Sequence, residues 1–217
     1  MGHASQVEQV SVGPLALPGD LDLPHDAAAL VLFAHGSGSS RQSARNRHVA
    51  EVLHRHHLGT LLFDLLSPDE ATDRRNVFDI ALLGARVGMA LAWASNQSAL
   101  SGLPLGLCGA STGAAAALVA AAARPGSVAA VVSRGGRPDL AADCLARVDS
   151  PTLLIVGSAD QEVLALNRAA LRLLTCTRRL EVVPGATHLF EEPGALDCVA
   201  EIAAAWFESH LASRRFQ

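Results

Sequence analysis

Ser111 is the residue whose surroundings most strongly suggest chemistry. It lies in the segment LCGASTG, residues 107–113, with Gly109 two positions before it and Gly113 two positions after it. Gly-x-Ser-x-Gly between a strand and a helix is the nucleophile elbow, a turn so tight that larger flanking side chains would collide with backbone. An apolar run precedes the motif and an alanine-rich run follows it. This context favours a nucleophile over a chance match.

A serine hydroxyl attacks at neutral pH only with a base in hydrogen-bond reach, and the base needs an orienting carboxylate. In the chain order that accompanies this elbow, the acid and then the histidine follow the serine. Asp160 and His188 come at the ends of two later predicted strands, so we expect them to be the acid and the base. The alternatives are a helix N-cap for Asp160 and a surface-loop position for His188. Asp139 and Asp143 are rival acids, but they lie before or within a predicted helix.

Acyl transfer also needs N–H donors for the oxyanion. We expect one to be the backbone N–H of Thr112, the residue after the nucleophile. The second should come from the glycine-rich loop at residues 35–38, His-Gly-Ser-Gly, and the Ser37 N–H is our choice. The alternative is that this loop is only a strand-to-helix turn.

Arginines near the ends of the predicted strands offer a second kind of chemistry. A guanidinium binds a carboxylate through two parallel hydrogen bonds, and Arg134 is the residue we assign to a substrate carboxylate. The competing interpretation is a structural ion pair with Asp139 or Asp64. Three further arginines lie beside glycine-containing loops and have the same two interpretations, substrate binding or a structural ion pair: Arg41, Arg45 and Arg137.

Alternating apolar and helical segments must position these residues. Strands buried on both faces appear as unbroken apolar runs, and strand-helix alternation implies right-handed crossovers and a parallel sheet. We expect strands at 29–34, 59–63, 103–108, 128–132, 152–156 and 179–183. We expect helices at 42–57, 73–98, 112–124, 140–147, 163–174 and 195–213. Residues 7–23, which are interrupted by prolines, should form one or two edge strands.

The bulk composition fits one α/β domain over residues 1–217 and excludes several other classes. Half of the 217 residues are hydrophobic and 18% are charged, which excludes a disordered chain. The net charge of -4 argues against a nucleic-acid partner. The apolar runs are too short to span a bilayer, and no signal peptide is visible, so we expect a cytoplasmic protein without a membrane partner. The cysteines and histidines lack metal-ligand spacing, and we expect neither a metal nor a cofactor.

With these residues placed, the chain resembles the α/β-hydrolase superfamily and, within it, the small dienelactone-hydrolase-like branch that has no large lid. The resemblance extends from about residue 29 onward and depends on segments such as VLFAHGSGSS, GLCGASTGAAAAL, TLLIVGSADQ and PGATHLFEEPG. It implies a triad of Ser111, Asp160 and His188 that hydrolyses esters or lactones without a metal. Dienelactone hydrolase itself uses a cysteine nucleophile, whereas this chain has Ser111, with Cys108 inside the preceding strand.

This departure favours a serine carboxylesterase acting on small soluble esters. The alternatives of the same fold are a dienelactone or lactone hydrolase, a thioesterase and an acyltransferase. A non-catalytic binding module is a further alternative, which a damaged triad or a blocked oxyanion loop would favour. The sequence does not decide the natural substrate or the oligomeric state.

Overall fold

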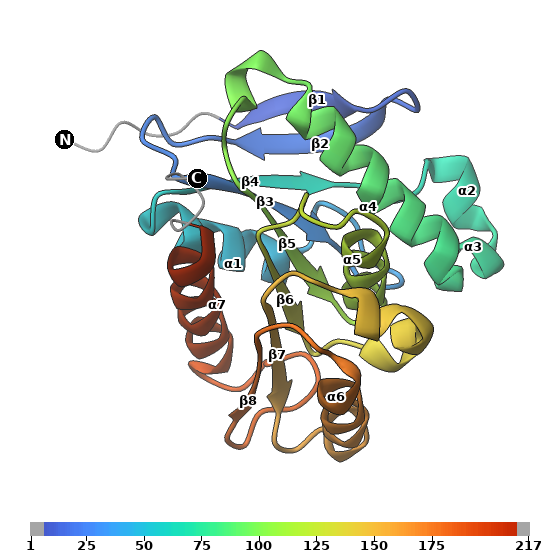
Figure 1. Ribbon diagram of the computed structural model, residues 1–217, viewed down its shortest axis with the longest axis vertical. Coiled ribbons are helices and arrows are strands. Elements are labelled where there is room, and N and C mark those ends of the chain that lie inside the picture. Colours follow the sequence, from blue (N-terminus) through green and yellow to red (C-terminus); the bar gives the residue numbers. More distant parts are fainter. Residues whose placement is uncertain (1–6, 212–217) are drawn as a thin grey trace.

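The computed structural model describes residues 7–211, which form a twisted eight-stranded sheet with helices on both faces (Figure 1). The strand order is β1-β2-β4-β3-β5-β6-β7-β8. Strands β3 to β8 are parallel, and β1 and β2 are antiparallel additions at one edge. The strands are β1 (Glu8–Val12), β2 (Leu17–Asp22), β3 (Ala29–Ala34), β4 (Leu58–Phe63), β5 (Leu105–Ala110), β6 (Ala130–Arg134), β7 (Thr152–Gly157) and β8 (Arg178–Val183).

The central strands follow from the apolar runs of the sequence. Every residue of β3, β4, β6 and β7 is buried, as expected for parallel strands covered on both faces. The fold is therefore the α/β architecture that the sequence predicts, with six parallel strands and two N-terminal strands.

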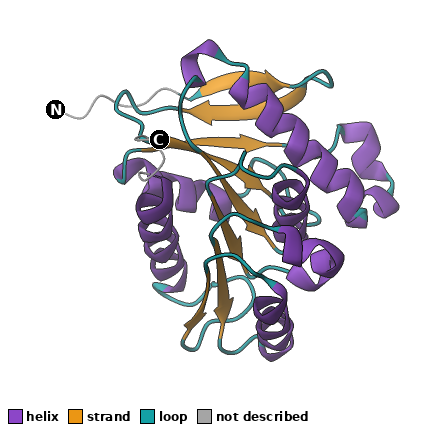
Figure 2. Cartoon of the chain, in the orientation of Figure 1, coloured by secondary structure: helices purple, strands orange, loops and turns teal. Residues whose placement is uncertain are grey.

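Helices cover the two faces of the sheet in two groups (Figure 2). On one face α1 (Ala44–Arg55) packs against α7 (Ala195–Leu211). On the other face α4 (Ile80–Ser95), α5 (Thr112–Ala123), the 3-10 segment η2 (Pro138–Arg147) and α6 (Gln161–Leu173) pack in that order. The short helices α2 (Pro68–Thr72) and α3 (Arg74–Phe78) precede α4, and the 3-10 turn η1 (Ser98–Leu100) follows it.

The continuous helix predicted at 73–98 is wrong, because the structure has separate helices there. Asp73 accepts a hydrogen bond from the Arg75 N–H and caps α3, and Asp79 accepts one from the Leu82 N–H and caps α4. Aspartate side chains that bond nearby backbone N–H groups compete with the helical hydrogen-bond pattern. Each aspartate therefore starts a new helix.

Smaller differences concern element ends. The short helix expected at 140–147 is a 3-10 segment over residues 138–147, and β5 and β6 each begin and end two residues later than predicted. The last two residues of the predicted helix at 195–213 lie outside the described residues. Between residues 7 and 211, no helix combines the length and apolarity needed to cross a membrane.

Candidate active site

The nucleophile elbow at Ser111 has the strained backbone that its sequence predicts. Ser111 has φ +50° and ψ -122°, a region that side-chain-bearing residues rarely occupy. A Cβ on Gly113 would lie 2.1 Å from the Ala34 carbonyl oxygen, and a Cβ on Gly109 would lie 2.4 Å from the Ala114 Cα. Glycine at 113 lets α5 approach the end of β3, and glycine at 109 lets β5 approach the first turn of α5. The turn places Ser111 at the N-terminus of α5 and at the carboxyl end of the sheet.

The loops after β7 and β8 bring the predicted acid and base together. The Ala159 N–H donates to the Ala186 carbonyl at 3.0 Å, and the Gly185 N–H donates to the Ser158 hydroxyl at 2.7 Å. Between these joined loops, His188 Nδ1 lies 2.7 Å from Asp160 Oδ2. Asp160 Oδ1 also accepts from the Val163 N–H at the start of α6. Asp160 thus caps a helix and contacts the histidine at the same time.

Ser111 and His188 line one cavity of about 270 Å³, which we call the serine cavity; it is also lined by Arg45, Asn46 and Arg134. No hydrogen bond joins Ser111 to His188 among the contacts of the described residues. Hydrogen bonds between catalytic groups are often long without substrate and tighten in the complex. The shared cavity brings Ser111 and His188 to the same space.

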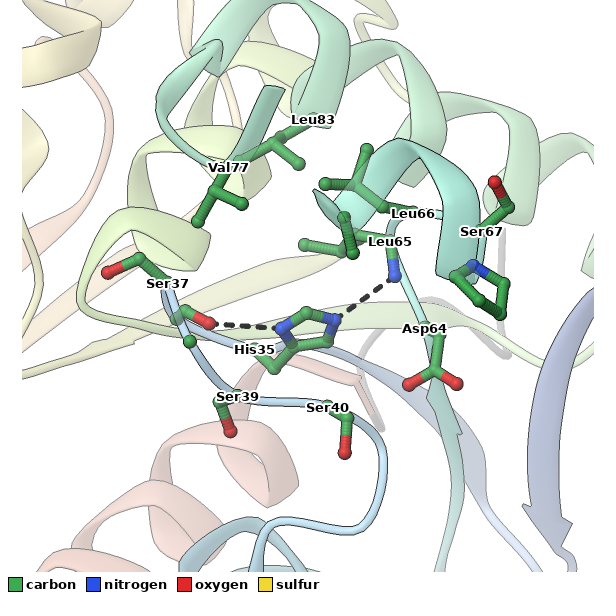
Figure 3. A pocket seen from close by; sticks show the side chains of 14 residues that line it. His35, Ser37, Ser39, Ser40, Asp64, Leu65, Leu66, Ser67, Val77 and Leu83 are labelled. Atoms are coloured by element: carbon green, nitrogen blue, oxygen red, sulfur yellow. Dashed lines mark hydrogen bonds between the residues drawn. The ribbon is translucent and has the colours of Figure 1, made fainter. Parts of the chain in front are cut away.

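The loop after β3 carries the expected oxyanion donor, and His35 holds its backbone (Figure 3). His35 Nδ1 lies 3.0 Å from the Gly36 carbonyl, and His35 Nε2 accepts the Leu65 N–H at 3.1 Å. Because Nε2 is an acceptor, Nδ1 carries the proton and donates it to Gly36. Burial lowers the pKa of His35, against the opposing effects of the Gly36 hydrogen bond and Asp64, so the ring is neutral at neutral pH.

The Ser37 N–H, our predicted second donor, makes a hydrogen bond of 2.9 Å to the Thr112 hydroxyl. In a trans peptide the C=O and N–H point in opposite directions. With its carbonyl fixed on His35, the peptide between Gly36 and Ser37 directs its N–H toward the elbow. A Cβ on Gly36 would lie 3.1 Å from the Ser111 Cβ, which shows how close this loop comes to the nucleophile.

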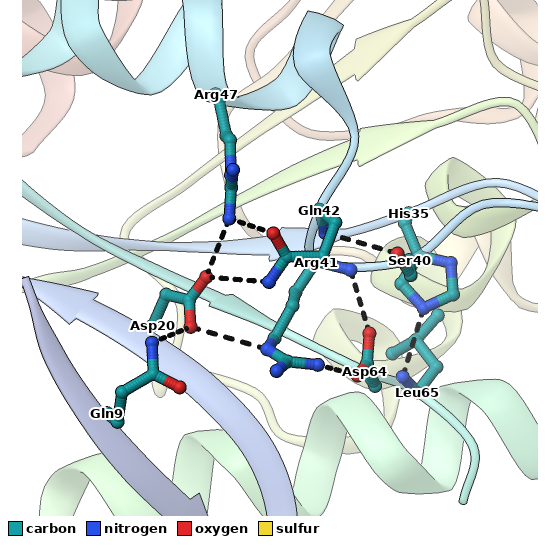
Figure 4. Close-up of polar contacts among 9 residues, drawn as sticks. All are labelled: Gln9, Asp20, His35, Ser40, Arg41, Gln42, Arg47, Asp64 and Leu65. Atoms are coloured by element: carbon teal, nitrogen blue, oxygen red, sulfur yellow. Dashed lines mark hydrogen bonds and ion pairs between the residues drawn. The ribbon is translucent and has the colours of Figure 1, made fainter. Parts of the chain in front are cut away.

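An ion-pair network fixes the far end of the same loop (Figure 4). The Arg41 guanidinium donates to Asp64 Oδ2 at 2.5 Å and to Asp20 Oδ1 at 3.3 Å, and the Arg41 N–H donates to Asp64 Oδ1 at 2.8 Å. Arg47 also contacts Asp20. The loop after β3 is thereby attached to β2 and to the end of β4. Of the two interpretations given for Arg41, substrate binding or a structural ion pair, the structure shows the ion pair with Asp64.

Arg134 differs from the other arginines. Arg137 pairs with Asp139 at 2.8 Å and Arg45 contacts Glu191 at 3.4 Å, but no ion pair involves Arg134 among residues 7–211. Its side chain is buried, lines the serine cavity and donates to the Asn46 amide oxygen at 2.7 Å. Burial lowers the pKa of Arg134, and the neighbouring Arg45 lowers it further, against the effect of Cys108. The result is a buried cation without a counter-ion beside the nucleophile.

Sequence reasoning missed two contributors to this site. His35 belongs to the loop predicted to supply an oxyanion donor, and its own contacts are indicated only by its place directly after a buried strand. Asn46 was not singled out, and its contact with Arg134 spans 88 positions of the chain, so no local pattern reveals it.

Cys108 cannot replace Ser111 as a nucleophile. Its side chain is buried in β5, and burial raises the pKa of its thiol to about 12. The thiolate is the reactive form of cysteine. Of these two side chains, Ser111 is the one that lines the serine cavity.

Comparisons with known proteins identify the family and the fold. The dienelactone hydrolase family model matches residues 60–211. The chain is similar to the crystal structure of a dienelactone hydrolase from Anabaena variabilis, with 51% identity, a TM-score of 0.93 and coverage of 97% of this chain and 100% of that chain. Est1E from Butyrivibrio proteoclasticus has the same fold, with a TM-score of 0.80, 16% identity and coverage of 96% of this chain and 100% of that chain.

Two curated relatives carry a different name. The chain is 56% identical over 203 residues to putative phosphoribosyl transferases from two strains of Mycobacterium tuberculosis, a match that covers 94% of this chain and 46% of each relative. The chain thus spans about half the length of these relatives. On the match over residues 60–211, the chain belongs to the dienelactone hydrolase family.

Proposed function

We propose that this protein is a serine esterase that cleaves carboxylic esters of small substrates through an acyl-enzyme. The observation that carries the proposal is the convergence of the strained Ser111 and the His188–Asp160 pair on one cavity. His188 accepts the Ser111 proton as Oγ attacks the carbonyl carbon, then gives that proton to the departing alcohol. Water activated by His188 releases the acid. Asp160 fixes the Nδ1–H tautomer and stabilises the imidazolium.

Backbone N–H groups stabilise the oxyanion in this proposal. The Thr112 N–H lies at the first turn of α5, where helical N–H groups have no carbonyl partner within the helix. The Ser37 N–H is the second donor. When the oxyanion forms, this N–H breaks its hydrogen bond to the Thr112 hydroxyl and donates to the oxyanion instead. Loss of one such donor costs about 3 to 4 kcal/mol of transition-state stabilisation.

We further propose that Arg134 binds an anionic group of the substrate, such as a carboxylate. A buried charge without a counter-ion destabilises the folded protein. Such a charge is typical of functional sites, where a bound ligand of opposite charge pairs with it. The Asn46 contact orients the guanidinium while leaving its remaining donors for a ligand.

Intact-mass measurement with a fluorophosphonate probe tests the nucleophile. Wild type should gain one adduct, Ser111→Ala should gain none, and Ser39→Ala, which changes another serine of the same cavity, should label like wild type. Asp160→Asn should lower kcat by about 10⁴-fold, since it favours the wrong histidine tautomer. A folded wild type that neither labels nor hydrolyses esters would contradict the proposal and favour a ligand-binding role.

Arg134→Met should raise KM for esters that carry a carboxylate by about tenfold or more, because a hydrogen bond to a charged group is lost. Neutral esters of the same size should be unaffected. Arg137→Met is the matched control, because Asp139 already neutralises Arg137. Equal effects of Arg134→Met on charged and neutral esters would show that Arg134 only supports the structure.

A further inference from the structure

A second cavity, of about 340 Å³, is lined by the loop after β3 and by the residues that follow β4 (Figure 3). We call it the leucine cavity, after Leu65, Leu66 and Leu83 in its wall. Gly36, Ser37 and Ser39 line both this cavity and the serine cavity. The loop that presents the proposed oxyanion donor is therefore the partition between the two spaces.

The two cavities differ in charge. The titratable residues in the wall of the leucine cavity are His35 and Asp64. The His35 ring is neutral, and both Asp64 oxygens accept hydrogen bonds from Arg41. In contrast, the serine cavity has Arg45 and Arg134 in its wall. The leucine cavity suits an uncharged apolar group, and the serine cavity suits a polar or anionic one.

The base decides which part of an ester enters which cavity. When Ser111 Oγ forms its bond to the carbonyl carbon, the bond from that carbon to the alcohol oxygen breaks, and the proton held by His188 goes to this oxygen. The alcohol must therefore leave on the side of His188. His188 lines the serine cavity and not the leucine cavity. With the oxyanion directed at the loop and the alcohol on the side of His188, the acyl arm extends away from His188, past the loop residues that line both cavities.

We propose that the leucine cavity is the acyl-binding subsite, which selects apolar acyl groups, while the alcohol occupies the serine cavity beside Arg134. This inference rests on the proposed esterase function. Its specificity-determining residues are Ala71 on α2 and Val77 on α3, which line the leucine cavity from its outer side.

The test compares cavity-filling variants on two series of esters. Ala71→Phe places a phenyl group in the leucine cavity, and Thr72→Phe places one at the next exposed position of α2, outside the lining. One series varies the acyl chain from acetate through butyrate to hexanoate with a constant p-nitrophenyl group. The other varies the alcohol from methyl through butyl to hexyl with a constant acetyl group.

Ala71→Phe should lower kcat/KM for the hexanoate by about tenfold or more, because a hydrophobic pocket discriminates by this factor for a small change in fit. Its acetate hydrolysis and its whole alcohol series should match those of Thr72→Phe. Val77→Ala enlarges the same cavity and should move the preferred acyl chain to greater length. Fluorophosphonate labelling of each variant verifies an intact Ser111.

Three results would overturn the inference while leaving the esterase function intact. These are an unchanged acyl-chain profile in Ala71→Phe and Val77→Ala, an effect on the alcohol series instead, and an equal effect of Thr72→Phe. If wild type neither labels nor hydrolyses any ester of either series, the proposed function fails and the acyl subsite fails with it.

Discussion

At the scale of single residues, His35 controls one peptide plane beside the nucleophile. Its neutral ring donates to the Gly36 carbonyl and accepts from the Leu65 N–H, so it needs both ring nitrogens in fixed roles. An asparagine can keep the donor to Gly36 but does not reach the Leu65 N–H. Alanine keeps neither contact. The two substitutions therefore separate the orientation of the peptide from the anchoring of the ring.

We expect His35→Ala to lower kcat more than it changes KM, because a misdirected Ser37 N–H affects the oxyanion and not the bound ester. His35→Asn should recover part of the lost kcat. The affinity for a boronic acid, which forms a tetrahedral adduct with serine, should fall in parallel with kcat. Equal kcat values for wild type and His35→Ala would contradict a positioning role.

The burial of His35 makes the stability of the protein sensitive to acid. Its pKa in the folded protein lies below the ordinary value of 6.5, to which it returns on unfolding. As the pH falls below this value, the unfolded chain binds a proton that the folded chain does not, so the free energy of unfolding falls. Urea denaturation at about pH 7.5 and about pH 5.5 should show a smaller loss for His35→Asn than for wild type. An identical loss in both proteins would rule out His35 as the titrating group.

At the scale of elements, the elbow depends on glycines that no other residue can replace. Gly113→Ala would place a methyl group against two backbone carbonyls, so β3 or α5 must move. We expect it to cost at least about 2 kcal/mol of stability and to abolish labelling of Ser111. Gly102→Ala is the control, because its φ is positive but no atom lies near its added Cβ. The control should cost about 1 kcal/mol and leave labelling unchanged. Chemical denaturation and intact mass measure both effects.

The elements were largely predictable where the pattern of side chains decides them. Unbroken apolar runs predicted the five inner parallel strands, because burial on both faces permits little else, whereas β8, with the sequence RRLEVV, lies at the sheet edge and is only partly buried. The helix at 73–98 was wrong because its apolar periodicity continues through Asp79, and only the side-chain contact with Leu82 shows that a new helix begins there. The periodicity of apolar residues does not reveal where an aspartate side chain, rather than a helix carbonyl, accepts a hydrogen bond from a backbone N–H group.

The site was predictable only in part, for a similar reason. The order of Ser111, Asp160 and His188 follows from the elbow and the strand ends, and the structure joins Asp160 to His188. The isolation of Arg134 was not predictable, since it depends on Asp139 and Asp64 being taken by Arg137 and Arg41. Which of several arginines meets which carboxylate is decided by the folded loops.

At the scale of the whole molecule, one of the largest core side chains packs at the end of the sheet opposite to Ser111. Phe207 on α7 is fully buried and lies over Gly106 at the start of β5, whereas Ser111 follows the end of that strand. Phe207→Ala should lower the free energy of unfolding by about 3 to 5 kcal/mol. Phe78→Ala, at a half-exposed phenyl, is the control and should cost far less.

Below its unfolding temperature, Phe207→Ala should keep the wild-type kcat/KM for a short ester. Thermal denaturation and steady-state kinetics on the same samples check both statements. A large loss of kcat/KM in the folded variant would show that the two ends of the sheet are coupled.

The hydrogen bond from the Ser37 N–H to the Thr112 hydroxyl gives the resting site an acceptor of its own. Under the proposed mechanism, the substrate must displace this hydroxyl. A neutral ester carbonyl gains little by the exchange, because one neutral acceptor replaces another. A charged oxyanion gains much more, since charge-assisted hydrogen bonds are about twice as strong. The Thr112 hydroxyl thereby competes with the substrate for the Ser37 N–H, and it weakens binding of the neutral ester more than binding of the charged transition state. Catalysis depends on such preferential binding of the transition state.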